Sequence, residues 1–255
     1  MARSDERRRI FPFLDGRRSV ARSLPMSDPA KAELLRSLGR LLRGLTALFW
    51  GLPLTLLVYA QTAHTGWLDA LGWFAIVPAL LSTGLLWHGL HLMGDFQKQE
   101  RVWIRALEQG QLLALTNLGL CPFLFWWHRL PSVPLYGIAV LLLTISSLAF
   151  LYHFNYLLQR LAAMLPDETL RHETRVFGSF NRVLILVAPL LFSAYFAASR
   201  LPALPEVMVR LLTLLEPPFG LWMILFLLLM PLAMTLALIW KIKETIFASV
   251  FGPER

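Results

Sequence analysis

Long apolar segments alternate with short polar segments along this chain. Six apolar runs approach the roughly 20 residues that a helix needs to cross about 30 Å of hydrocarbon. They are Leu41 to Ala60, Leu71 to Met93, Gln111 to Trp127, Pro134 to Leu158, Val183 to Ala198 and Phe219 to Trp240. This pattern predicts an all-α polytopic membrane protein built as a six-helix transmembrane bundle.

Composition agrees with that fold class. Of the 255 residues, 56% are apolar and 16% are charged, whereas soluble domains carry about 25% charged residues. A water-soluble globule is therefore excluded. The same pattern predicts three regions: a basic tail (1–40), a transmembrane domain (41–240) and a short second tail (241–255).

The basic residues predict which way the spans run. Of the 24 lysines and arginines, 21 lie in segments that six spans would place on the same side as the amino terminus. Because positive loops stay inside, both termini are expected in the cytoplasm. The net charge of +8 then reflects orientation in a membrane rather than binding to nucleic acid. A bacterial cytoplasmic (inner) membrane is the expected location.

Three segments outside the spans have amphipathic patterns. A short helix is expected to open at Ser27, Asp28 and Pro29, which form an N-cap pattern with proline in the first turn. Residues 95–110 are expected to lie as a helix on the inner surface. Residues 206–216 carry one narrow polar stripe, which predicts a helix in the outer interface.

Prolines suggest an internal repeat. Pro53, Pro122 and Pro189 each lie within an odd-numbered span, at separations of 69 and 67 residues. This spacing favours three helical hairpins descended from one unit. The same prolines are the expected packing or hinge positions of the odd spans.

The middle of each span lacks ionisable acids and bases. No aspartate, glutamate, lysine or arginine lies there, although transport, proton relay and catalysis are the usual reasons to keep one. GxSxG, HExxH and Walker motifs are also absent from the sequence, so catalysis is not expected. The polar residues at depth are mostly hydroxyls such as Thr235, and Asn117 is the residue expected to join neighbouring helices.

Two histidines are the candidate cofactor ligands. His88 and His153 lie at matching distances from the inner ends of the second and fourth spans, as two axial ligands of haem b would. The single cysteine, Cys121, allows no intrachain disulfide and no cysteine-based zinc site. In the loop at residues 167–173, a salt-bridged helix is favoured over a metal site.

These observations favour a non-catalytic integral membrane subunit or an assembly partner of a larger membrane complex. Its expected partners are the lipid bilayer and other membrane subunits. One alternative is a transporter or flippase for an apolar or amphipathic solute, with the odd-span prolines as hinges. The other is a haem b electron-transfer anchor that uses His88 and His153.

Overall fold

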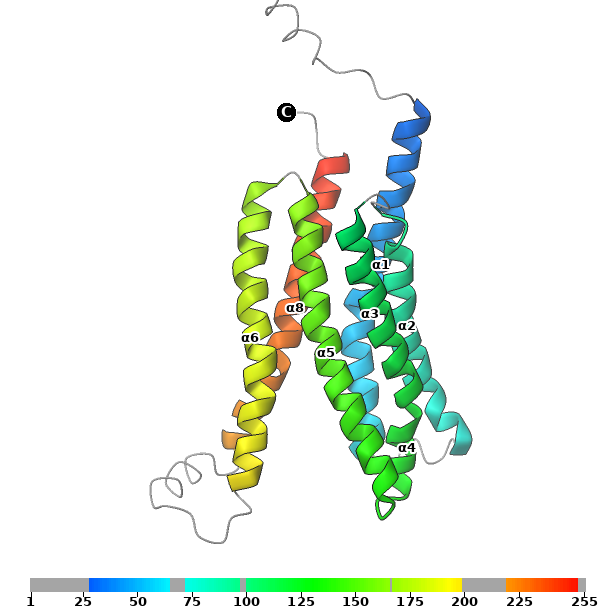
Figure 1. Cartoon of the computed structure of the whole chain (residues 1–255), viewed down its shortest axis with the longest axis vertical. Helices are drawn as coiled ribbons and strands as arrows, with labels where there is room; N and C mark the ends of the chain where they lie inside the picture. Colours follow the sequence, from blue (N-terminus) through cyan, green and yellow to red (C-terminus); the bar gives the residue numbers. More distant parts are fainter. Residues whose placement is uncertain (1–27, 65–71, 97–99, 166, 199–218, 252–255) are drawn as a thin grey trace, which may run out of the picture. The chain divides into compact units, whose positions relative to one another are not determined.

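The structure is a computed structural model that describes residues 28–64, 72–96, 100–165, 167–198 and 219–251. These residues form helices and contain no strand, which confirms the all-helical class. The helices are α1 (Asp28–His64), α2 (Val77–Met93), α3 (Arg101–Leu120), α4 (Pro122–Arg129), α5 (Pro134–Met164), α6 (Glu168–Ala198) and α8 (Phe219–Phe251) (Figure 1).

Four helical segments are long and apolar enough to cross a membrane, counting only the described residues. They are Leu35–Ala63, Gly72–Met93, Pro134–Met164 and Glu168–Leu191. These segments support a membrane protein and overlap the predicted first, second, fourth and fifth spans. The predicted third span is divided between α3 and α4, and the predicted sixth lies in α8.

The first helix is longer than the sequence pattern suggests. The helix expected to open near Asp28 is present, but α1 continues from there to His64 without a break. The chain divides into two compact units, with the boundary between Gly39 and Arg40. Of the described residues, the first unit therefore contains only the start of α1.

The prediction of a separate surface helix at residues 95–110 is wrong. From Arg101 onward this segment is the first half of α3. The Trp103 side chain is fully buried, and its ring meets the edge of Phe96 at a centroid distance of 6.3 Å. The apolar side that suggested a membrane surface therefore packs inside the protein. The expected outer helix at residues 206–216 lies outside the described residues.

Cys121 separates α3 from α4. Because Pro122 has no backbone N–H, it cannot bond the Leu118 carbonyl one turn earlier. The Cys121 thiol donates to that carbonyl oxygen instead, with 3.3 Å between sulfur and oxygen. The side chain is buried, so the single cysteine has a structural role at this break.

Glycines allow α1 and α2 to approach closely. A Cβ added to Gly44 would lie 2.6 Å from the Gly89 carbonyl oxygen and 2.8 Å from Cγ of Met93. About four turns further along α1, the Tyr59 hydroxyl pairs with the Thr83 hydroxyl of α2 at 2.8 Å. Small residues at a helix crossing increase the contact between backbones, which is a main source of helix association in lipid.

The remaining helices pack in sequence order. α2 packs against α3, α3 against α5, α5 against α6, and α6 against α8 (Figure 1). Pro53 and Pro189 lie inside α1 and α6, as predicted for odd spans, and Pro231 lies inside α8. Pro122 instead begins α4.

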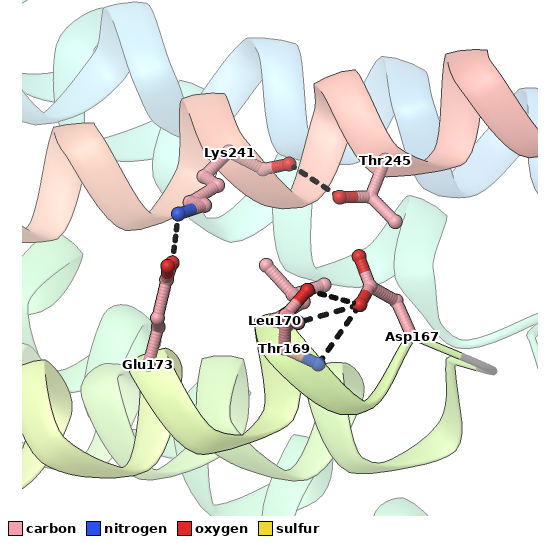
Figure 2. Close-up of polar contacts among 6 residues, drawn as sticks. All are labelled: Asp167, Thr169, Leu170, Glu173, Lys241 and Thr245. Carbon is pink, nitrogen blue, oxygen red and sulfur yellow. Dashed lines mark hydrogen bonds and ion pairs between the residues drawn. The ribbon is translucent and has the colours of Figure 1, made fainter.

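Polar contacts fix the start of α6 (Figure 2). Asp167 precedes the helix, and its Oδ1 accepts hydrogen bonds from the backbone N–H groups of Thr169 (2.9 Å) and Leu170 (3.2 Å). Figure 2 also shows Glu173 of α6 paired with Lys241 of α8. The amino-terminal end of α6 therefore lies beside the carboxyl-terminal half of α8, as in an antiparallel pair.

Candidate functional site

Three helices contribute to one buried polar cluster, formed by Asn155 of α5, Asn181 of α6 and Thr235 of α8. Each of these side chains is 0% exposed. Asn181 Nδ2 lies 2.9 Å from Asn155 Oδ1 and 2.9 Å from Thr235 Oγ1. Asn155 Nδ2 donates to the same threonine oxygen at 2.9 Å. We call these residues the Asn155–Asn181–Thr235 cluster.

Proline shapes the α8 side of this cluster. The Pro231 carbonyl oxygen accepts from Thr235 Oγ1 at 2.8 Å and from Asn181 Nδ2 at 3.0 Å. Three oxygens therefore surround the Asn181 amide nitrogen, which has only two hydrogens. These three oxygens also determine which atom of the Asn181 amide is nitrogen. In the flipped orientation, the amide oxygen would lie against the Pro231 carbonyl oxygen and the other acceptors.

The cluster has one unfilled acceptor. Asn181 Oδ1 is buried without a hydrogen-bond partner among the described residues. A buried carbonyl oxygen without a partner costs about 1–3 kcal/mol, so it favours an added donor such as a water or a hydroxyl group. The arrangement joins three helices and can accept one more hydrogen bond, but it contains no ionisable side chain.

A second polar contact lies between α1 and α2. The Tyr59 and Thr83 hydroxyls form a hydrogen bond with each other. Thr83 Oγ1 also lies 2.7 Å from the Ala79 carbonyl oxygen of its own helix. These contacts link α1 to α2 through neutral groups.

Asn117 is buried in α3, as its assignment to a helix-packing role requires. Its side-chain Oδ1 has no hydrogen-bond partner among the described residues, while its backbone oxygen accepts from the Cys121 N–H at 2.9 Å. Whether Asn117 joins helices through its side chain stays a prediction.

The two candidate haem ligands occupy different environments. The His153 Nε2 lies 2.7 Å from the Ala106 carbonyl oxygen of α3, so this histidine joins α5 to α3. His88 is exposed on α2. Binding of haem through His153 Nε2 would replace the contact with Ala106, and haem ligation by this pair stays a prediction.

The acidic segment at the start of α6 forms a helix cap. The pKa of Asp167 is lowered from its usual value, first because the Thr169 hydroxyl donates to the carboxylate and then because the Leu170 backbone N–H does. Among the described residues, no group of three or more histidine, cysteine or acidic side chains could hold a metal ion.

Sequence reasoning missed Asn155 and Asn181 and included Thr235 only as one hydroxyl among many. Asn155 lies near the inner end of the predicted fourth span, and Asn181 precedes the predicted fifth span, so neither counted as a residue at depth. A usable signal was present for Asn155, which lies in an apolar stretch of the fourth span, whereas the residues before Asn181 are largely polar. Their contact depends on how α5, α6 and α8 pack, which a linear pattern does not contain.

Comparisons with protein-family models, with curated proteins and with solved structures find no match to this chain.

Proposed function

We propose that this protein is a non-catalytic, multi-pass membrane subunit that organises other components of a larger membrane complex. The observation that carries the proposal is the chemistry of the buried polar side chains in the described residues. All of them are amides or hydroxyls, namely Thr55, Thr62, Ser82, Thr83, Asn117, Asn155, Thr174, Asn181 and Thr235. Such groups hold helices together but supply no general acid or base.

Exposed apolar helix surface supports a role in assembly. Large apolar side chains are exposed along α5 and α6, including Leu135, Ile138, Leu141, Leu142, Ile145, Val183, Leu186 and Leu190. In a membrane, lipid tails or the helices of partner subunits cover such side chains. A subunit that joins others needs faces of this kind on more than one helix.

The proposal includes a six-span topology with both termini in the cytoplasm of a bacterium. Antiparallel contacts between α1 and α2 and between α6 and α8 support an arrangement of consecutive hairpins. In the predicted three-hairpin repeat, the middle hairpin would have α3 and α4 together as its first arm and α5 as its second arm. The orientation is supported by the basic residues, because 21 of the 24 lie in segments that six spans would place on the side of the amino terminus.

Purification of the full-length protein from its native membrane in mild detergent tests the proposal. Mass spectrometry is expected to find stoichiometric membrane subunits that remain bound. A monodisperse, colourless monomer without partners would contradict the proposal. A Soret band with reduced-minus-oxidised peaks would instead support the haem anchor and direct attention to His88 and His153.

A transporter or flippase for an apolar or amphipathic solute is the second candidate. The Asn181 Oδ1 beside Pro231 favours it. This buried acceptor has no hydrogen-bond partner in the part of the chain that the structure describes, so it could meet a polar group of a passing solute. Substitution of Asn117 and of the hydroxyls at depth separates the candidates. The bound partners of a scaffold would remain, whereas the flux through a carrier would be lost.

A further inference from the structure

Two arginine–tyrosine pairs lie where α5 packs against α6, with the two tyrosines one helical turn apart on α5. The Arg182 guanidinium carbon of α6 lies 5.8 Å from the Tyr152 ring centroid of α5. On α5 itself, the Arg160 guanidinium carbon lies 5.2 Å from the Tyr156 ring centroid. Arg160 Nε also donates to the Tyr156 hydroxyl oxygen at 2.9 Å. We call these four residues the arginine–tyrosine patch.

The patch carries positive charge without a neighbouring carboxylate. Neither Arg160 nor Arg182 forms an ion pair with any described residue. Glu173, an acidic residue on the neighbouring part of α6, pairs with Lys241 on α8 instead. Arg175 is exposed about two turns before Arg182, on the same face of α6, and adds a third positive charge.

Arg182 has unused hydrogen-bond donors. Its Nε is buried without a partner among the described residues, and its Nη2 makes only a long contact of 3.5 Å to the Ser179 hydroxyl. The Tyr152 ring limits the positions of the guanidinium group. A guanidinium with free donors binds a phosphate through two parallel hydrogen bonds, which makes phosphate the anion that this geometry fits.

Apolar surface begins immediately beside the arginines. On α6, exposed Val183, Leu186 and Leu190 follow Arg182, and on α5 exposed Leu142 and Ile145 precede Tyr152. Tyrosine and arginine are typical of the headgroup level of a membrane, where the ring lies against apolar chains and the polar end remains wet. A soluble phosphate would use only the arginines, whereas a phospholipid would also cover the apolar side chains.

We propose that the arginine–tyrosine patch binds the phosphate headgroup of an anionic phospholipid, whose acyl chains lie along the exposed apolar side chains of α5 and α6. Arg182 and Arg160 bind the phosphate, Tyr152 and Tyr156 position the two guanidinium groups, and Arg175 adds to the electrostatic attraction. Basic pockets between membrane helices bind anionic headgroups in this manner. The site is independent of whether the protein is a scaffold or a transporter.

Lipid titration of the full-length protein tests this site. The protein is delipidated in detergent and titrated with phosphatidylglycerol or phosphatidylcholine of identical acyl chains. Bound lipids are counted by native mass spectrometry. We expect phosphatidylglycerol to bind in preference, and Arg182→Gln and Arg160→Gln each to weaken that binding about fivefold. Equal binding of the two lipids would overturn the proposal.

Arg129→Gln is the matched control. The guanidinium carbon of Arg129 in α4 also lies over an aromatic ring, 4.7 Å from the Phe125 centroid. Arg129 precedes the start of α5, whereas the arginine–tyrosine patch lies near the carboxyl-terminal end of α5. Its substitution removes the same charge and should leave phosphatidylglycerol binding unchanged, so an equal loss would overturn the proposal. If Arg182→Gln does not fold, Arg182→Lys, which keeps the charge and loses the bidentate geometry, should weaken binding by a smaller factor.

A soluble anion distinguishes the two sources of phosphate. Glycerol 3-phosphate is added to the delipidated protein at millimolar concentration, and its effect on the melting temperature is compared with that of phosphatidylglycerol. We expect the lipid alone to raise the melting temperature. An equal rise with glycerol 3-phosphate, lost in Arg182→Gln, would identify a free-phosphate site and overturn the lipid assignment.

Discussion

Thr235 differs from most described threonines in the hydrogen-bond partners of its hydroxyl group. Thr46, Thr116 and Thr144 each donate to a carbonyl four residues earlier in their own helix. Thr235 does the same with Pro231, but it also accepts from asparagines of two other helices. At the residue scale, the specificity of the packing therefore depends on a few side chains with partners on other helices.

Thr235→Val should lower the free energy of unfolding by about 1–2 kcal/mol, because it removes the acceptor that both asparagine amides use. Thr144→Val is the matched control, since that hydroxyl is exposed and bonds only its own helix. Its effect should stay within about 0.5 kcal/mol. Unfolding in a detergent titration gives both values. Equal losses in the two variants would show that the cluster does not join the helices.

Asp167 makes the start of α6 sensitive to acid. Its pKa is lower in the folded protein than in the unfolded chain, so the carboxylate stabilises the fold at neutral pH. This stabilisation is complete above the unfolded pKa of about 3.9 and is lost as the pH falls through the lower folded value. Asp167→Ala should therefore lower the melting temperature at pH 7 and have little effect in strong acid.

Asp167→Asn separates the cap from the charge. An asparagine oxygen can still accept from the Thr169 and Leu170 N–H groups, but it does not titrate in this range. The melting temperature of this variant should approach that of the wild type at pH 7, and the contribution of the cap should be independent of pH. A melting temperature as low as that of Asp167→Ala would contradict a role of the cap itself.

At the scale of elements, the crossing of α1 and α2 depends on glycine. Gly44→Leu should separate the two helices, because a side chain there would meet the Gly89 backbone oxygen, which cannot move away as a flexible side chain could. We expect a loss of about 2 kcal/mol or more in the free energy of unfolding, as for overpacking of a core. Gly84→Leu is the control, since nothing lies within 4 Å of a Cβ at Gly84.

Elements were easier to predict than their contacts. Runs of leucine and other apolar residues predicted α1, α2, α5 and α6, because a segment of that length and composition has few alternatives in lipid. The sequence pattern did not predict the break at Cys121, because the apolar run continues through it. The break follows from Pro122, which has no N–H to bond the Leu118 carbonyl. Trp103 was assigned to a membrane surface because amphipathic periodicity identifies an apolar face but not what covers that face.

The buried thiol tests the break between α3 and α4. Cys121 is 1% exposed and donates to Leu118, so it should react with a maleimide only after denaturation. Mass spectrometry measures the fraction of labelled protein over time. Fast labelling of the folded protein would contradict the packing of this segment. Since Cys121 is the single cysteine, the labelling requires no background substitution.

At the scale of the whole molecule, the number of spans decides which loops share a side of the membrane. Four described segments are apolar enough to cross, whereas the sequence pattern predicts six spans. The two topologies differ in whether α3 with α4 crosses as one unit and in whether α8 crosses. They therefore assign opposite sides to residue 131, which follows α4, and to residue 166, which follows α5.

Reporter fusions at these two positions distinguish the topologies. With six spans and a cytoplasmic amino terminus, fusions after residues 98 and 166 should give fluorescent green fluorescent protein, and a fusion after residue 131 should give active alkaline phosphatase. With spans only at α1, α2, α5 and α6, residue 131 would share the side of residue 98 and residue 166 would lie opposite. We expect the six-span result, because it leaves Arg171 and Arg175 with the other basic residues on the cytoplasmic side. Phosphatase activity after residue 166 would remove that asymmetry and contradict the orientation on which the proposed function depends.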